Sequence, residues 1–129
     1  MTSTDGDSKA DGVMEIAGVA ALAVDSQDPR MLANWWQRLL GGRVEVDSDG
    51  DVMLYLASGL NIIFLAVPDV KRSKNRLHLD LRARAYEEAV REALALGAVP
   101  APDVYEGERW TVLRDPEGNE FCILRPRPQ

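Results

Sequence analysis

The sequence predicts an α+β protein in which two βαβββ modules form one curved, eight-stranded mixed sheet. Three observations predict this fold. The same order of strand-like and helix-like segments occurs twice, with a period of just under half of the 129 residues. Both helical segments end in leucine followed by glycine, at Leu40-Gly41 and Leu96-Gly97, where glycine readily adopts the conformation that ends a helix. Each half then closes with a glycine-containing turn and a final apolar strand.

The first module begins with the apolar segment 16–24, which we predict as a buried strand because it is short and precedes a turn. Asp28 and Pro29 then predict a helix start, since aspartate caps free N–H groups and proline presets φ at the first helical position. The helix carries apolar residues at helical spacing: Leu32, Trp35, Trp36, Leu39 and Leu40. Three strands are predicted after it, at residues 43–46, 52–56 and 61–67.

The second module follows a basic stretch at residues 71–76. Residues 77–82 alternate strictly, with His78, Asp80 and Arg82 on one face, and this alternation predicts a strand. A helix is predicted at 85–96 and an edge strand at 99–104, because Pro100 and Pro102 cannot donate to a sheet ladder. Two more strands are predicted on either side of the turn that starts at Asp115, namely 109–113 and 120–124.

These elements predict one domain at residues 13–126, with modules at about 15–68 and 75–126, after a disordered tail at 1–12. The net charge of −6 argues against nucleic-acid or anionic-membrane partners, because both require a basic face. The chain has no apolar run of ~18 residues that could span a membrane. Its one cysteine excludes an internal disulfide and fits a reducing compartment. We therefore expect a soluble, cytoplasmic, single-domain protein, and composition alone says nothing about its chemistry.

Four segments carry a resemblance to a known family. They are WWQRLLG at 35–41, NRLHLDL at 75–81, ALGA at 95–98 and WTVLRDPEGNEFCIL at 110–124, and the last is the most specific. With them the sequence resembles the vicinal oxygen chelate (VOC) superfamily, in its glyoxalase-like and bleomycin-resistance-like branch, over about residues 15–126. The resemblance implies the glyoxalase/bleomycin resistance fold. It implies no single function, because the superfamily includes glyoxalase I, extradiol dioxygenases, fosfomycin-resistance proteins and bleomycin-binding proteins.

The resemblance also implies where a metal would bind. In metal-dependent members, four side chains on the first and last strands of each module point into the cup of the sheet. Here those positions hold Val19, Ile63, His78 and Cys122. Valine and isoleucine cannot bind a cation, and two donors are too few for a hard divalent ion. We therefore expect no metal and no other cofactor; a soft-metal site of His78, Cys122 and Glu120 is the alternative.

Strand alternation places a candidate ligand pocket in the same cup. Aromatic and apolar residues would line the pocket, and Arg76 and Arg114 would give it a cationic rim. The alternative is ordinary core packing of the same side chains. The candidate ligand-binding residues are Val19, Met53, Tyr55, Ile63, Arg76, His78, Asp80, Trp110, Arg114 and Cys122.

Two functions remain open on this evidence. The first is metal-independent binding of a small molecule in the cup. The second is an enzyme of lyase, isomerase or dioxygenase type, which would use His78 as an acid–base group, oriented by Asp80, or a rebuilt metal site. Cys122 is either a small buried hydrophobe or the thiolate partner of His78. We expect a homodimer, because the free sheet edges need covering.

Overall fold

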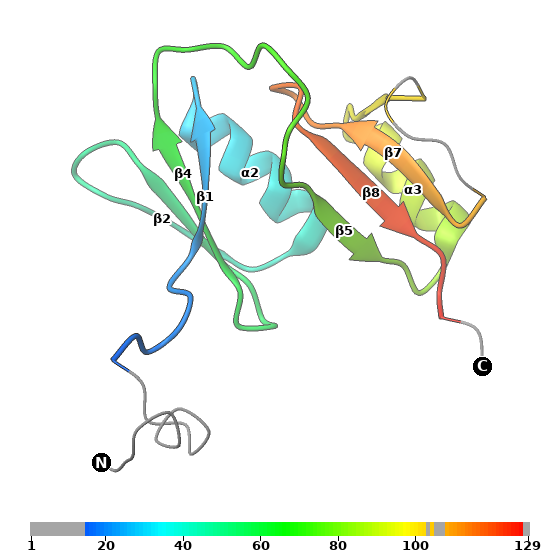
Figure 1. The fold of residues 1–129 in the computed structure, drawn as a ribbon, viewed down its shortest axis with the longest axis horizontal. Coiled ribbons are helices and arrows are strands. Elements are labelled where there is room, and N and C mark those ends of the chain that lie inside the picture. The colour runs from blue at the N-terminus through cyan, green and yellow to red at the C-terminus, as the bar shows by residue number, and fades with distance from the viewer. Residues whose placement is uncertain (1–14, 103, 105–107, 128–129) are drawn as a thin grey trace.

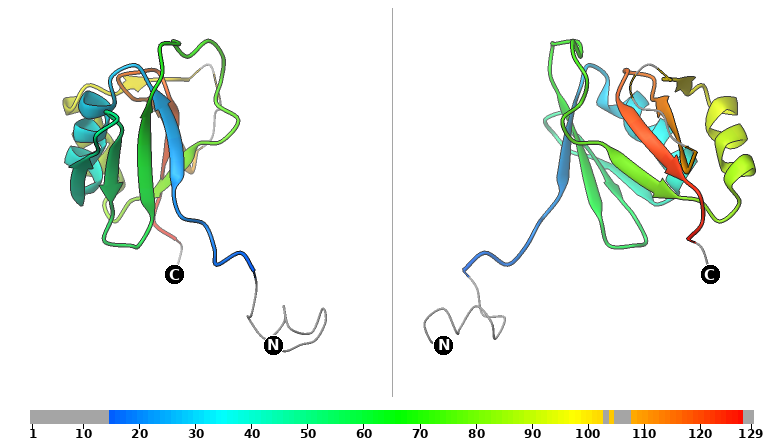
Figure 2. Two further views of the ribbon diagram at one scale, coloured as in Figure 1. Left: turned by 90° about the vertical axis from the view of Figure 1, so that its left-hand side faces the viewer. Right: turned by 45° about the vertical axis from the view of Figure 1, so that its right-hand side comes forward.

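Two four-stranded sheets form one layer of the molecule, and two helices lie on the same side of both sheets (Figures 1 and 2). The computed structural model describes residues 15–102, 104 and 108–127. The tail predicted at residues 1–12 therefore lies outside the described residues. No described helix has the length and apolar character needed to cross a membrane.

Both modules have the predicted βαβββ order. The first consists of β1 (Leu22–Ser26), α2 (Pro29–Leu40), β2 (Arg43–Val46), β3 (Val52–Tyr55) and β4 (Asn61–Ala66). The second consists of β5 (Leu79–Arg82), α3 (Tyr86–Ala95), β6 (Val99–Pro100), β7 (Trp110–Arg114) and β8 (Glu120–Leu124). The strand orders β1-β4-β3-β2 and β5-β8-β7-β6 match. In each sheet one pair of strands is parallel, β1 with β4 and β5 with β8. The predicted fold class is confirmed, with the eight strands hydrogen-bonded as two separate sheets.

The start and end of α2 follow from local chemistry. The Asp28 carboxylate accepts a hydrogen bond from the backbone N–H of Met31 at 3.2 Å, and Pro29 occupies the first helical position. After the helix, Gly42 has φ +98°, and a Cβ there would lie 2.4 Å from the carbonyl oxygen of Tyr55. Glycine is therefore required at the turn from α2 into β2.

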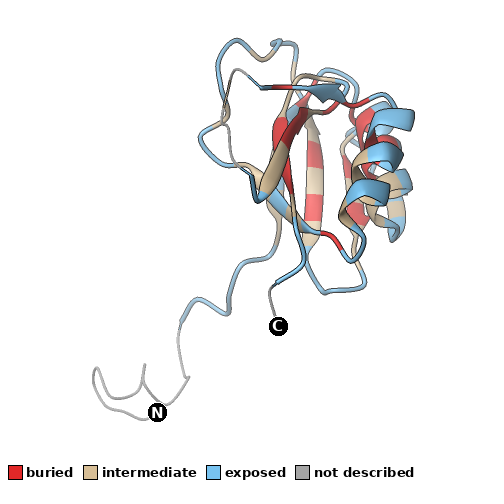
Figure 3. Ribbon diagram, turned by 90° about the vertical axis from the view of Figure 1, so that its right-hand side faces the viewer, coloured by how far each residue is buried: buried red, intermediate tan, exposed pale blue. Residues whose placement is uncertain are grey.

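The core lies between the sheets and the helices, where Figure 3 shows most of the buried residues. Ile62, Phe64, Phe121 and Ile123 point to the helix side and are at most 2% exposed. Phe121 of β8 also meets α2 of the other module, because its ring centroid lies 4.9 Å from that of Trp36. The two modules thus share one core, and the strand faces have the predicted parity.

The prediction for the first strand was wrong in its first part. Residues 16–20 are exposed and lie outside any strand, and Val19 is 88% exposed. The reason is register: β1 pairs only with β4, and this pairing begins with Leu22 opposite Ile62. The other strands differ from prediction only at their ends, most of all β6, which stops at Pro100.

Candidate functional site

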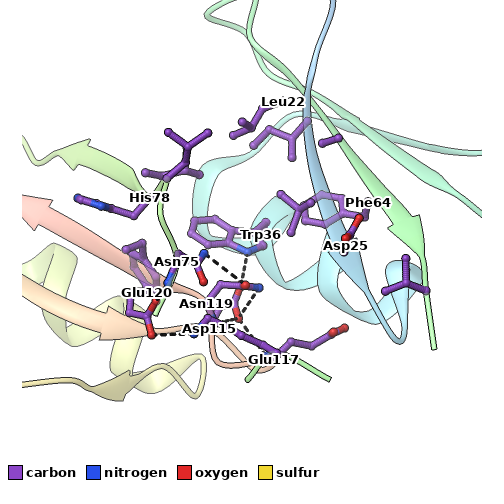
Figure 4. Close-up of a pocket in the computed structure, with 18 of the residues that line it drawn as sticks. Leu22, Asp25, Trp36, Phe64, Asn75, His78, Asp115, Glu117, Asn119 and Glu120 are labelled. Carbon is purple, nitrogen blue, oxygen red and sulfur yellow. Dashed lines mark hydrogen bonds and ion pairs between the residues drawn. The ribbon is translucent and has the colours of Figure 1, made fainter. Parts of the chain in front are cut away.

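A cavity of about 540 Å³ opens between the inner edges of the two sheets (Figure 4). This volume falls within the range of small-molecule sites, which is roughly 300–1,000 Å³. Apolar side chains from both modules form most of its walls, among them Leu22, Val24, Trp36, Phe64, Leu79 and Phe121.

The turn between β7 and β8 forms a polar end of this cavity. Gly118 N–H donates to the carbonyl of Asp115 at 2.9 Å and closes the turn. Inside the turn, Asp115 Oδ1 accepts from the backbone N–H groups of Glu117 and Asn119, at 3.0 and 2.9 Å. Its Oδ2 accepts from Trp36 Nε1 at 2.9 Å. The sequence Asp-Pro-Glu-Gly-Asn therefore folds a turn around one carboxylate and attaches it to α2 of the other module.

Asp115 is a buried carboxylate that has no cationic partner among the described residues. Its side chain accepts hydrogen bonds only, from two backbone N–H groups, from Asn119 Nδ2 and from Trp36 Nε1, and this is the bonding pattern of the ionised form. Burial raises the pKa of Asp115 above its usual range, while the hydrogen bonds from Asn119, Trp36 and Glu117 oppose the rise. A positive charge nearby would stabilise this carboxylate.

Glu117 links the turn to the first module. Its carboxylate accepts hydrogen bonds from the Ser26 hydroxyl and from the backbone N–H groups of Gln27 and Asp28, the last two at 2.9 and 3.2 Å. These donors lie where β1 ends and α2 begins. No ion pair joins Glu117 to another described residue either, so two carboxylates without an ion-pair partner lie at this end of the cavity.

Glu120 lies at the base of the same turn, opposite Arg114 in the pairing of β7 with β8, but its environment is different. It is 4% exposed, and it accepts from Lys71 Nζ at 3.0 Å and from Asn75 N–H at 2.8 Å, with Arg114 Nε at 3.4 Å. Burial alone would raise the pKa of Glu120, but the Asn75 and Lys71 contacts outweigh it and hold the pKa below the usual range. The lysine charge in this cavity is thus already neutralised.

His78, Asp80 and Cys122 form a second polar cluster beside the cavity. His78 Nε2 lies 3.0 Å from Asp80 Oδ1, and one donor atom from each of the three residues lies within 4.8 Å of the others. Burial raises the pKa of the Cys122 thiol to about 11, and the charge of Asp80 and its hydrogen bond with the thiol add to this rise. Cys122 is therefore a protonated thiol at neutral pH, which argues against a thiolate–imidazole pair.

The four family metal positions do not fit a hard divalent ion. Val19 lies outside β1, and Ile63 on β4 offers no donor atom. On the second sheet, Cys122 offers a protonated thiol. The three donors of His78, Asp80 and Cys122 all come from one module, and they are the described residues that could hold a softer ion.

The structure brings together only part of the predicted ligand site. Met53, Tyr55 and Ile63 share the face of the first sheet that points away from the helices, where Arg43 lies over the Tyr55 ring at 4.3 Å. On the second sheet, Trp110 packs with Val112 and Cys122 against Ala101 and Val104. Arg114 lines a second surface depression with the basic stretch, and Arg76 is exposed. Of the ten predicted residues, only His78 lines the cavity.

Sequence reasoning missed the acidic side of the cavity. Asp25 and Asp69, which line it, follow from no motif. Asp115 and Glu117 were visible only as turn residues, because nothing in the sequence indicates that this turn meets Trp36, 79 residues away. The contact of α2 with the second module, which creates the cavity, could not be read from the pattern.

Comparison with known proteins agrees with this architecture. A family model described as a glyoxalase-like domain matches residues 21–124. A search of curated protein sequences gives no match. The solved structures that match include a genomically encoded fosfomycin resistance protein, FosX, from Listeria monocytogenes, with a TM-score of 0.70, 17% identity and coverage of 87% of this chain and 93% of that one.

Another match is a glyoxalase/bleomycin resistance protein/dioxygenase family enzyme from Burkholderia phytofirmans, with a TM-score of 0.67 and 19% identity over 84% of this chain and 98% of that one. At these identities the structures establish the fold alone. The family model, in contrast, covers most of the chain, so this protein belongs to the glyoxalase-like domain family of the vicinal oxygen chelate superfamily.

Proposed function

We propose that the protein binds a small, largely apolar molecule in the cavity between its two modules, without a metal ion. The observation that carries the proposal is the cavity itself, with its volume of about 540 Å³, its apolar walls and its polar end. Aromatic and aliphatic walls stabilise a bound apolar body by excluding water, and the polar groups orient it.

A relative of the same fold supports small-molecule binding. A FosX variant from Listeria monocytogenes, with a TM-score of 0.71 and 15% identity, was solved in complex with Mn(II) and 1S,2S-dihydroxypropylphosphonic acid. In this chain Ile63 offers no atom that could bind a metal ion, and the Cys122 thiol is hydrogen-bonded to Asp80. We therefore propose binding of the molecule by the protein alone.

Blocking the cavity tests the proposal. Leu22→Trp places a larger side chain at the edge of β1, where Leu22 lines the cavity, whereas Leu60→Trp changes an exposed loop residue outside it. We expect 2-(2-naphthyl)ethanol, followed by ligand-observed NMR, to bind the wild type and Leu60→Trp. Leu22→Trp should lose this binding while it keeps its fold by circular dichroism. Equal binding to all three proteins would reject the cavity as the site.

A second candidate function is acid–base catalysis on the same bound molecule. His78 lines the cavity, and Asp80 lies 3.0 Å from its Nε2, so a molecule in the cavity is beside an oriented imidazole. If the protein is an enzyme, His78→Asn should abolish turnover and leave binding within about threefold. Unchanged turnover in this variant would exclude His78 as the catalytic group.

The proposal includes a cytoplasmic homodimer. β1 and β5 are edge strands of their sheets, and apolar residues stand exposed beside them, with Val19 and Leu77 88% and 77% exposed. A second copy of the chain would cover such edges. Light scattering at tens of micromolar, roughly where a moderate interface is populated, should give twice the chain mass of 14.3 kDa. A strict monomer would contradict this part.

A further inference from the structure

We infer that the molecule bound between the modules is an organic cation, an amine or amidine on an apolar body. This inference rests on the proposed binding function and adds the chemical class of the ligand. It follows from the charges around the cavity, from where they gather and from which of them have partners.

The described residues lining the cavity carry far more negative than positive charge. Five of them are carboxylates, and Lys71 bears the one fixed positive charge: the carboxylates are Asp25, Asp69, Asp115, Glu117 and Glu120. The ammonium of Lys71 lies 3.0 Å from Glu120, which Arg114 also approaches. This contact leaves the other four carboxylates without compensation from the lining.

These four carboxylates come from three places in the chain that meet at one end of the cavity. Asp25 lies near the end of β1, and Asp69 follows the end of β4, which runs parallel to β1 and so ends at the same edge. Glu117 is hydrogen-bonded to Ser26 and Gln27 at that edge, and Asp115 lies two residues before it (Figure 4). One end of the cavity is therefore acidic, while its walls are apolar.

The hydrogen bonding of these carboxylates also favours a cationic ligand. Asp115 is 3% exposed and accepts only neutral N–H donors, and a buried carboxylate in this state is stabilised by any nearby positive charge. Asp25 and Asp69 are exposed, and among the residues that the structure describes no hydrogen bond or ion pair involves their carboxylates. Their oxygens can accept charge-assisted hydrogen bonds from an ammonium group directly.

The same field disfavours an anion. An anionic group at the acidic end would face like charges and lose its hydration without a donor to replace it. Arg72 and Lys74 of the basic stretch do not line the cavity; they line a second depression, which shares Lys71, Glu117 and Glu120 with it. The apolar walls, in contrast, accept the body of any probe equally, so charge alone should separate matched ligands.

Three probes with one naphthyl body test the inference: 2-(2-naphthyl)ethylamine, 2-(2-naphthyl)ethanol and 2-naphthylacetate. Titration calorimetry at low salt should give the amine an affinity about tenfold above the alcohol, as one charge-assisted contact supplies, and the acetate the weakest binding. Near 1 M salt, screening should reduce the preference for the amine.

Paired variants assign this preference to the acidic end. Asp25→Asn with Asp69→Asn should bring the affinity for the amine to within about threefold of the affinity for the alcohol, because two of the carboxylates that can accept its charge-assisted hydrogen bonds are gone. Glu87→Gln with Glu88→Gln removes the same charge from exposed positions on α3 and should change neither affinity. This control separates a local effect from the net charge of −6.

Each outcome decides a different question. If the alcohol binds as tightly as the amine, or the acetate binds best, the cation inference is wrong while the cavity remains a binding site. The same holds if the α3 variant loses the preference as fully as the cavity variant. If none of the three probes binds, or Leu22→Trp leaves all three bound, the proposed binding function fails, and the inference fails with it.

Discussion

Replacing Trp36 with phenylalanine tests the link between the shared core and the acidic end of the cavity. Trp36 Nε1 donates to Asp115 Oδ2 at 2.9 Å, and both side chains are almost fully buried. Losing a hydrogen bond to a charged group costs about 1.5–3 kcal/mol. The smaller ring also leaves a void, worth about 1 kcal/mol by analogy with small core deletions. We expect Trp36→Phe to lower the free energy of unfolding by about 2.5–4 kcal/mol.

Trp35→Phe is the matched control for this variant. Trp35 is as buried as Trp36, but its Nε1 donates to a neutral acceptor, the Leu96 carbonyl, at 2.8 Å. A neutral hydrogen bond contributes about 0.5–1.5 kcal/mol, so this variant should lose about 1 kcal/mol less than Trp36→Phe. Urea unfolding followed by circular dichroism, with unchanged m values, gives both numbers.

The pH dependence identifies Asp115 as the cause. Burial raises the pKa of Asp115 in the folded protein, and the Trp36 hydrogen bond opposes the rise because it favours the ionised form. Its loss therefore costs most where Asp115 is ionised. The stability difference between wild type and Trp36→Phe should be largest at neutral pH and narrow as the pH falls through the pKa of Asp115. A difference that is equal for both tryptophans and independent of pH would refute the reasoning.

Three further predictions concern the second sheet. Trp110→Ala should cost less than the roughly 3–5 kcal/mol of a core tryptophan, because Trp110 is half-buried; a thermal melt with the full loss would place it in the core. Cys122 should react slowly with a thiol reagent at pH 8, since its pKa is about 11, and faster in Asp80→Asn. Equal rates in both proteins would show that Asp80 does not raise the pKa of the thiol. Purified protein should hold no stoichiometric Mn, Fe, Ni or Zn, and these ions should not raise its melting temperature. One-to-one zinc that is lost in His78→Ala would instead indicate a site at His78, Asp80 and Cys122.

The fold was largely predictable because its signals are local. The Asp28-Pro29 start of α2, the Gly41-Gly42 end and the alternation in β5 each depend on a few neighbouring residues. The strand prediction for residues 16–20 was wrong for the same reason, because it used local signals alone. This segment is as apolar as a buried strand, but a strand also needs a partner, and the pairing of β1 with β4 begins only at Leu22.

The site was less predictable, because it depends on how the two modules meet. Strand parity placed His78, Asp80 and Cys122 on one face correctly, since period-two alternation is a local property. Parity says nothing about which faces close a cavity. Which faces enclose the cavity depends on the rings of Trp35 and Trp36, which contact Phe121 in the other module.

The turn at Asp115 shows how a fold motif can also set ligand chemistry. Its carboxylate is held by two N–H groups within its own turn and by Trp36 of the other module, so its first role is to join the modules. This contact between the modules also leaves the buried negative charge of Asp115 beside the cavity, and Glu117 adds a second negative charge there. An asparagine at 115 could still accept from the two N–H groups of the turn, but its NH2 group could not accept from Trp36 Nε1, so the joint to the other module requires the carboxylate. The charge thus follows from the architecture, and a cationic ligand is the partner that such an architecture favours.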